Sequence, residues 1–326
     1  MNYGKKLFFL MFVCVLSISL LLVSSGAALA AAFPTKPVTL IVPYPPGGGS
    51  DIGARLLSVE AEKILGQPIS IVNQPGAGGW IGWTALLNTK ADGYTIAHIN
   101  TPNVITGYVD PQQKRDKTLD NFAPILCFCI DDGILAINPK ETRFTDMKSL
   151  IAFAQKNEVT AAVTGAASDD DILLKTLNKE LNTKFVPVIS RGAAETIPAV
   201  MGGHVDILIA NVGEVKNPAA NGDLKPIAVT ALERTPIMPD VPTVKELTGA
   251  AVVGASARGL AAPAGTDPAV LKVLIDAFSK AAQVQSFRDK MMGQGLNVVA
   301  IAGDDYMKKM KEEEANVKSL APLFGW

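Results

Sequence analysis

Residues 38–51 read VTLIVPYPPGGGSD and set the interpretation of the rest of the chain. Val38–Val42 is an unbroken run of strand-forming residues, as expected for a buried strand. Leu57, Ala61, Ile64 and Leu65 follow at helical spacing, and Gly66 is expected to end that helix. A strand that passes through a glycine-rich turn into a helix is typical of parallel α/β folds.

The glycine-rich turn is also the first candidate for function. Gly47, Gly48 and Gly49 allow backbone N–H groups to approach a ligand closely. The free N–H groups and the positive dipole end of the following helix favour an anion there. Ser50 or Asp51 could cap the helix, and the alternative interpretation is a tight turn with an ordinary cap. The turn lacks the Gly-Lys-Ser/Thr ending of a P-loop.

Strand-like and helical patterns alternate along the whole chain. They predict an α/β fold with two periplasmic-binding-protein-like lobes (type II). Each lobe is expected to be a mainly parallel sheet flanked by helices, with a ligand cleft between the lobes. Two segments, 123–133 and 252–262, look like crossings between lobes, which permits hinge closure. We therefore predict a first lobe of residues 33–132 plus 254–326 and a second lobe of residues 133–253.

The N-terminus resembles a secretory leader. Lys5 and Lys6 precede an apolar run, Leu7–Val23, and Ala28-Leu29-Ala30 forms an A-x-A cleavage pattern. Residues 1–30 are thus predicted to be a signal peptide cleaved after Ala30, and an uncleaved membrane anchor is the alternative. The predicted location is the periplasm.

Composition excludes several classes of protein. The 30 Lys+Arg and 31 Asp+Glu residues give a net charge of −1, without the basic excess of a nucleic-acid binder. Two histidines and three cysteines are too few for a His/Cys zinc site, and no metal ligand is predicted. Cys127 and Cys129 are expected on one face of a strand, as buried hydrophobic residues in poor geometry for a disulfide.

Further turns could contribute to a ligand site. A second glycine loop, Asn73–Gly79, follows the second predicted strand, and two such loops on adjacent strands indicate a small anion site. Thr164–Asp171 precedes a helix that Ser168 could cap. Its three acids would disfavour a bare anion unless a cation or a ligand ammonium group is present, and whether they bind a cation or only cap the helix stays open. Arg191 could bind a carboxylate or be a solvated surface residue, and Asn211 and Glu214 could line the same site.

No catalytic pattern is evident. The chain has no G-x-S-x-G, H-E-x-x-H or C-x-x-C motif. His98 and His204 are expected to be structural or exposed, and Asp131 and Asp132 to be turn residues. We therefore predict a protein that is not an enzyme and needs no cofactor.

Several segments resemble the receptor family of the tripartite tricarboxylate transporters, also called the Bug family. They are Lys36–Asp51, Gly66–Pro68, Asn73–Gly79, Ala91–Thr95, Gly202–Asp206, Gly222–Thr230, Pro239–Thr243 and Gly259–Thr266. The resemblance implies a periplasmic receptor that holds a carboxylate through main-chain amides and ordered waters and delivers it to a membrane permease. Asp169–Asp171 and Ile189–Gly192 depart from the family pattern, so the choice among di-, tri-, aromatic and amino acids stays open.

The residues predicted to bind the ligand come from both lobes. Those in the first lobe are Tyr44, Pro46, Gly47, Gly48, Gly49, Ser50, Asp51, Gly76, Ala77, Gly78, Gly79, Asn100 and Thr101. Those in the second are Thr164, Gly165, Ser168, Asp169, Arg191, Gly192, Asn211 and Glu214. The alternatives are a secreted α/β enzyme acting on a small carboxylate and a solute sensor for another transporter class.

Overall fold

The structure, a computed structural model, describes residues 33–326. The predicted leader lies outside the described residues. Within residues 33–326, none of the helices combines the length and the apolar character needed to cross a membrane.

In the described residues, ten strands form one sheet in the order β2-β1-β3-β9-β4-β7-β5-β6, with β10 and β8 also paired to β4. The strands are β1 (Val38–Val42), β2 (Ile69–Asn73), β3 (Thr95–Thr101), β4 (Phe122–Ile137), β5 (Val159–Thr164), β6 (Phe185–Ser190), β7 (Ile207–Asn211), β8 (Lys225–Thr230), β9 (Ala255–Pro263) and β10 (Val298–Ala302).

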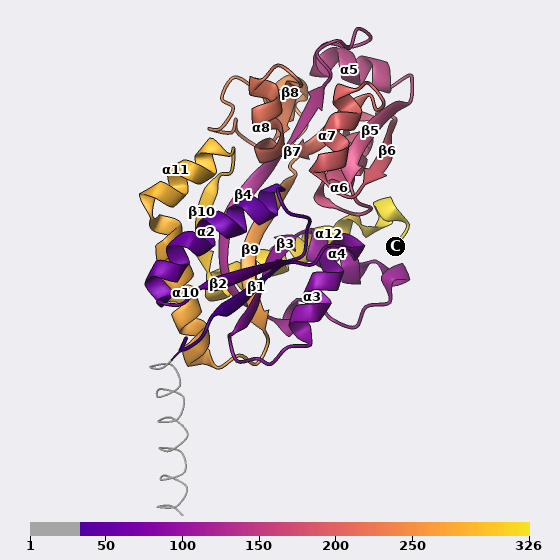
Figure 1. Cartoon of the computed structure of the whole chain (residues 1–326). Helices are drawn as coiled ribbons and strands as arrows, with labels where there is room; N and C mark the ends of the chain where they lie inside the picture. The colour runs from indigo at the N-terminus through magenta and orange to yellow at the C-terminus, as the bar shows by residue number, and fades with distance from the viewer. Residues whose placement is uncertain (1–32) are drawn as a thin grey trace, which may run out of the picture.

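Helices cover both faces of this sheet (Figure 1). They are α2 (Gly49–Leu65), α3 (Trp80–Leu87), α4 (Asn103–Val109), α5 (Met147–Ala154), α6 (Asp169–Leu181), α7 (Ala193–Met201), α8 (Val212–Ala220), α9 (Val244–Thr248), α10 (Pro268–Gln283), α11 (Gln285–Gly293) and α12 (Gly303–Leu320). Short 3₁₀ turns are η1 (Ala77–Gly79), η2 (Pro111–Gln113), η3 (Leu119–Asn121) and η4 (Ala321–Phe324). The predicted end of α2 is confirmed: Gly66 has φ 69°, and its N–H donates to Glu62 O at 2.9 Å.

Strand β4 runs from one part of the sheet into the other (Figure 1). Its residues 122–132 pair with β9, and its residues 133–137 pair with β7 and β8. At the junction, Gly133 N donates to Gly254 O at 2.7 Å, and Gly254 N donates to Thr230 O at 3.0 Å. We call β1, β2, β3, β9, β10 and the start of β4 the first half, and β5–β8 and the end of β4 the second half.

The sheet is mixed rather than mainly parallel. The parallel pairs are β1–β2, β1–β3, β5–β6 and β5–β7, as strand–helix alternation predicts. Every antiparallel pair contains β4 or β9. The reason is that the chain uses these two strands to pass between the halves and to return.

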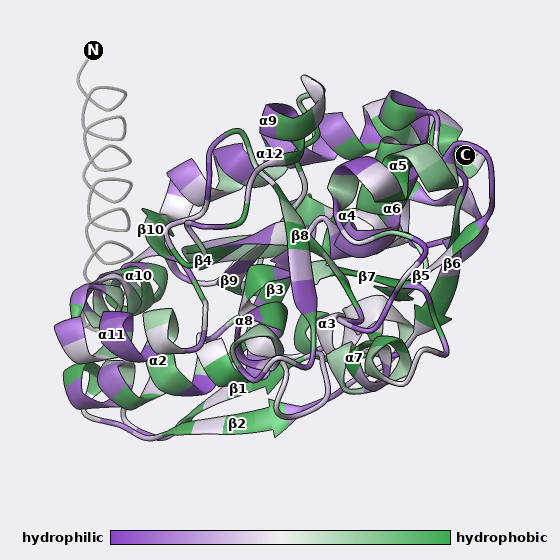
Figure 2. Ribbon diagram, turned by 90° about the horizontal axis from the view of Figure 1, so that it is seen from above, coloured by the Kyte–Doolittle hydropathy of each residue, from purple (hydrophilic) through white to green (hydrophobic). Residues whose placement is uncertain are grey.

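Each half buries apolar side chains on both sheet faces. Figure 2 shows hydrophobic residues, in green, along the strands and on the helices that flank them. In the first half, Leu40 and Phe278 pack on the face covered by α2, α10 and α11, and Trp83 and Tyr306 pack on the face covered by α3, α4 and α12. Two further apolar clusters cover the faces of the second half. Burying one large apolar side chain stabilises a fold by roughly 1.5–3 kcal/mol.

The expectation that Cys127 and Cys129 share a face is wrong. Cys127 packs in the cluster with Trp83, whereas Cys129 packs in the cluster with Leu40. The pairing of β4 with β9 shifts register at Pro124/Leu126 and again at Cys127/Cys129. A bulge of this kind adds an unpaired residue and resets the alternation of side chains. Both thiols are free and buried, and burial raises the pKa of each.

Candidate functional site

The two glycine loops lie next to each other at the ends of β1 and β2. Asn73 joins them, because its Nδ2 donates to Tyr44 O at 3.0 Å and to Asp51 Oδ1 at 2.9 Å. Gln74 N also donates to Val42 O at 2.8 Å. The structure therefore places both loops at the carboxyl edge of parallel strands, where open α/β sheets bind ligands.

The start of α2 differs from the expectation that Ser50 or Asp51 caps it. The helix begins at Gly49, its N-cap is Gly48, and no side chain caps it. Asp51 lies within the first turn and instead accepts bonds from Gly47 N and Arg55 Nε, both at 2.9 Å. The first N–H groups of a helix have no intrahelical acceptor, so this end of α2 presents free donors.

The carboxylate of Asp51 accepts its hydrogen bonds from residues of the glycine loops and α2. Burial alone would raise its pKa, but hydrogen bonds from Arg55, Asn73 and Gly47 outweigh burial and hold the pKa below its usual value. Asp51 thus braces the loop and remains charged.

The second loop has an unusual backbone. Gly76, Ala77, Gly78 and Gly79 all have positive φ, at 128°, 49°, 65° and 103°. A Cβ at Gly79 would lie 2.6 Å from the Trp83 ring, which explains the need for glycine at that position.

In the second half, hydrogen bonds to acidic side chains at the start of α6 stabilise the turn before this helix. The predicted cap is confirmed: Ser168 is the N-cap, and its Oγ accepts from Asp171 N at 3.3 Å. Asp170 accepts from Thr164 N at 3.0 Å, and Asp171 accepts from Ala167 N at 2.8 Å. Asp169 N donates to Asn103 Oδ1 of the first half at 3.3 Å, so this turn meets the other half of the molecule.

Sequence reasoning missed Arg258, which lies on β9 and is only 2% exposed. Its Nη2 pairs with Asp131 Oδ2 at 2.9 Å and donates to Asn211 Oδ1 at 3.3 Å. Its Nη1 lies against Gly49, where an added Cβ would overlap it. Within the described residues, Nε and Nη1 have no acceptor. The available signal was a charge inside the otherwise uncharged strand ASARGLAAP.

The expectation that Asp131 and Asp132 are turn residues is wrong, because both lie within β4 and pair with β9. Asp131 is 1% exposed and accepts from Gly213 N at 3.0 Å through Oδ1. Burial raises the pKa of Asp131 to about 7, against the opposing effect of Arg258. Burial alone would lower the pKa of Arg258, but the surrounding carboxylates raise it, so the guanidinium stays charged.

Other carboxyl groups converge on the same place. Burial is the largest cause of the raised pKa of Asp169, of Asp170 and of Glu214. Asp169 and Glu214 also repel each other, and Arg258 opposes the rise at both. The Tyr44 hydroxyl is buried beside Asn100, Asn103 and Asp169, and burial raises its pKa. The structure thus brings Tyr44 of the first glycine loop close to Asp169 at the start of α6, and Asp169 close to Glu214 in the first turn of α8.

Two predicted ligand residues lie elsewhere, and His98 has the structural role expected of it. Arg191 has a side chain that is 90% exposed and pairs with Glu195 at 2.9 Å, and Gly192 beside it faces open space. His98 is buried between Tyr44 and Phe128, and burial lowers its pKa to about 3. A histidine with that pKa is neutral at pH 7 and acts as a packing residue.

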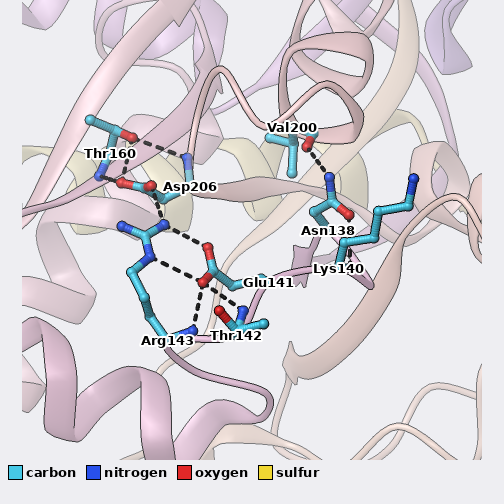
Figure 3. A network of polar contacts seen from close by, with 8 residues as sticks. All are labelled: Asn138, Lys140, Glu141, Thr142, Arg143, Thr160, Val200 and Asp206. Carbon is cyan, nitrogen blue, oxygen red and sulfur yellow. Dashed lines mark hydrogen bonds and ion pairs between the residues drawn. The ribbon is translucent and has the colours of Figure 1, made fainter.

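A separate pocket of about 240 Å³ lies in the second half. Figure 3 shows the network of polar contacts among residues that line it and their neighbours. Arg143 pairs there with Glu141 and Asp206, and Asp206 also accepts from Thr160 N at 2.8 Å. None of the predicted ligand-binding residues lines it. Across residues 33–326, no group of three or more His, Cys, Asp or Glu side chains is arranged to hold a metal ion.

Comparison with known proteins gives consistent matches. Residues 53–323 match the family described as "Tripartite tricarboxylate transporter family receptor". The chain is 30% identical over 304 residues to "UPF0065 protein in gbd 5'region" of Cupriavidus necator, covering 90% of each. It is 29% identical over 279 residues to "Protein BugT" of Bordetella pertussis, covering 84% of this chain and 85% of the relative.

Solved structures agree with these matches. A TctC solute-binding protein from Polaromonas has a TM-score of 0.70 at 29% identity, covering 89% of this chain and 99% of its own. MatC from Rhodopseudomonas palustris with bound malate has a TM-score of 0.80 at 25% identity, covering 88% and 99%. The predicted α/β, two-lobed periplasmic-binding-protein-like fold is confirmed.

Proposed function

The chain belongs to the receptor family of the tripartite tricarboxylate transporters, and we propose that it captures a small organic carboxylate in the periplasm. It then delivers this ligand to the membrane permease of such a transporter. The MatC structure with malate supports a carboxylate ligand for this site. Export through a signal peptide cleaved after Ala30 is part of the same proposal.

The observation that carries the proposal is the uncapped start of α2. Asp51 is already bonded to Gly47, Arg55 and Asn73, so the first N–H groups of the helix remain available to a ligand. The guanidinium of Arg258 lies against the same turn. A hydrogen bond to a charged group contributes about 1.5–3 kcal/mol. Several such bonds, less the cost of closure, are compatible with binding near −8 kcal/mol, or roughly micromolar affinity.

We propose that the two halves act as lobes made of residues 33–132 plus 254–326 and residues 133–253. Strand β4 and the chain around Gly254 connect them, which is the arrangement of a two-stranded hinge. A ligand that contacts both lobes would shift the population toward the closed form, which the permease could recognise. The proposed ligand residues are Arg258 and the residues predicted from the sequence, except Arg191 and Gly192. These two are proposed to lie at the rim of the site.

The receptor is proposed to release its ligand unchanged. Family membership favours binding over catalysis, and burial lowers the pKa of His98 to about 3, which makes it a very weak base. Incubation with a bound carboxylate should return the same molecule; conversion to a product would instead favour the secreted-enzyme alternative.

The site is tested by Gly48→Val. A side chain at Gly48 meets no atom within 4 Å, and φ −80° suits valine, so the variant should fold. It should lose measurable binding in calorimetry against mono-, di- and tricarboxylates and amino acids, because the side chain occupies the ligand's place. Gly293→Val is the matched control, since Gly293 also faces open space, at the end of α11.

Two results would contradict the proposal. Full affinity in Gly48→Val would remove the glycine loop from the site. Failure of the unmodified protein to bind any small acid would overturn the receptor function itself.

A further inference from the structure

We infer that the ligand of this site carries a cationic group as well as its carboxylate: it is a small zwitterionic acid, such as an amino acid, rather than a dicarboxylate. This inference rests on the proposed function and specifies the ligand class for the same site.

The first observation is an excess of carboxylates beside Arg258 and Tyr44. Asp169 starts α6 and Glu214 lies in the first turn of α8. Within residues 33–326 neither forms an ion pair, because the buried cation beside them, Arg258, makes its ion pair with Asp131.

The second observation points to an anion and is independent of the acids. Arg258 is 2% exposed, yet its Nε and Nη1 have no acceptor in the described part of the chain. Nη1 faces Gly49, the first residue of α2. A guanidinium against the positive end of a helix dipole is unfavourable unless an anion lies with them. The ligand carboxylate therefore belongs at α2 and Arg258.

The two observations define a ligand with opposite charges at its ends. With its carboxylate at Gly49 and Arg258, the rest of a small ligand extends toward Asp169 and Glu214. A second carboxylate there would meet like charges out of water, or could enter only with the uptake of a further proton, and either is costly. An ammonium group would neutralise them and could also donate a hydrogen bond to the Tyr44 hydroxyl oxygen, which is buried near Asp169 and has no partner within residues 33–326.

The direct test compares two acids of similar length. Succinate has a carboxylate at both ends, and γ-aminobutyrate has a carboxylate at one end and an ammonium at the other. Calorimetry on the protein should show that γ-aminobutyrate binds at least tenfold more tightly than succinate.

Matched variants assign the discrimination to the acids. Glu214 accepts a hydrogen bond from Asn211 N at 3.4 Å. Glu214→Gln keeps an acceptor for this N–H group but removes the charge. It should weaken binding of the ammonium-bearing acid at least tenfold without weakening binding of succinate, and Asp169→Asn should act in the same direction. Asp305→Asn, an exposed acid in the first turn of α12, should change neither affinity.

The outcomes separate the two proposals. Tighter binding of succinate than of the amino acids, or an equal effect of Glu214→Gln on both ligands, would overturn the inference and leave the receptor function standing. If neither class binds, the proposed function fails, and the inference with it. Thermal unfolding of each unliganded variant identifies any that do not fold, and the comparison of ligands on the unmodified protein decides the question without them.

Discussion

The glycine-loop side and the acidic side of the candidate site shift the pKa of their carboxyl groups in opposite directions. In the glycine-loop side, Asp51 accepts bonds from Gly47, Arg55 and Asn73, and its pKa is lowered. In the acidic side, Asp169 and Glu214 have no ion-pair partner in residues 33–326, and burial raises their pKa. The acid of the loop side thus has its partners within its own loop, and the free N–H groups of α2 and the unpartnered nitrogens of Arg258 are left for an anion. The acids of the acidic side have no such ion-pair partners in residues 33–326. The first is therefore suited to holding any carboxylate, and the second to choosing among carboxylates.

Arg258 lies between the two sides, and its removal should have the largest effect. Arg258→Met leaves Asp131 buried without its ion pair, which typically destabilises a protein by about 3–5 kcal/mol. Urea unfolding of the unliganded protein would measure this loss. A loss below about 1 kcal/mol would mean that Asp131 is protonated when folded and needs no partner.

Asp51→Asn tests whether the Asp51 carboxylate stabilises the glycine loop. The variant loses the charge that strengthens the bonds from Gly47, Arg55 and Asn73, and should cost about 1.5–3 kcal/mol in urea unfolding. Asp305→Asn, an exposed acid in another helix, should stay within about 0.5 kcal/mol of the unmodified protein. Equal effects in the two variants would contradict the bracing role of Asp51.

The acidic side predicts that the unliganded protein is more stable at pH 5 than at pH 7. Carboxyl groups whose folded pKa is raised, Asp131 to about 7, contribute stability that is complete below about pH 4. That contribution is lost as the pH rises toward 7, by up to about 1.4 kcal/mol per pH unit for each retained proton. Asp51 has the opposite sign, and its contribution is lost only as the pH falls below about 4.

Denaturant unfolding at several pH values would check this slope. Glu214→Gln should make it shallower because one of the raised carboxyl groups is gone. Stability that is constant or increases from pH 5 to pH 7 would show that the acidic side is already neutralised.

The smallest effect is expected at Arg191. Its side chain is 90% exposed, and its pair with Glu195 is a surface ion pair, so Arg191→Ala should leave thermal unfolding unchanged. The contrast with Arg258→Met isolates burial as the reason that one arginine matters to stability. A clear loss of ligand affinity in Arg191→Ala would move this residue from the rim into the site.

Much of the fold follows from local patterns. The run Val38–Val42, the helix that ends at Gly66 and the cap at Ser168 are all where the sequence predicts them, because strand formation, glycine stops and helix caps depend on neighbouring residues. The prediction that Ser50 or Asp51 caps α2 is wrong, since three glycines allow the helix to begin before these residues.

For this chain, the alternation of strands and helices, the two glycine loops and the family resemblance can be obtained from the sequence, because each depends on residues close together along it. The opposite packing of Cys127 and Cys129, the burial of Asp131 and the place of Arg258 against Gly49 cannot. These depend on a register shift between β4 and β9 and on contacts between segments far apart in the chain. Side-chain burial and charge pairing are properties of the assembled sheet, so only the tertiary structure decides them.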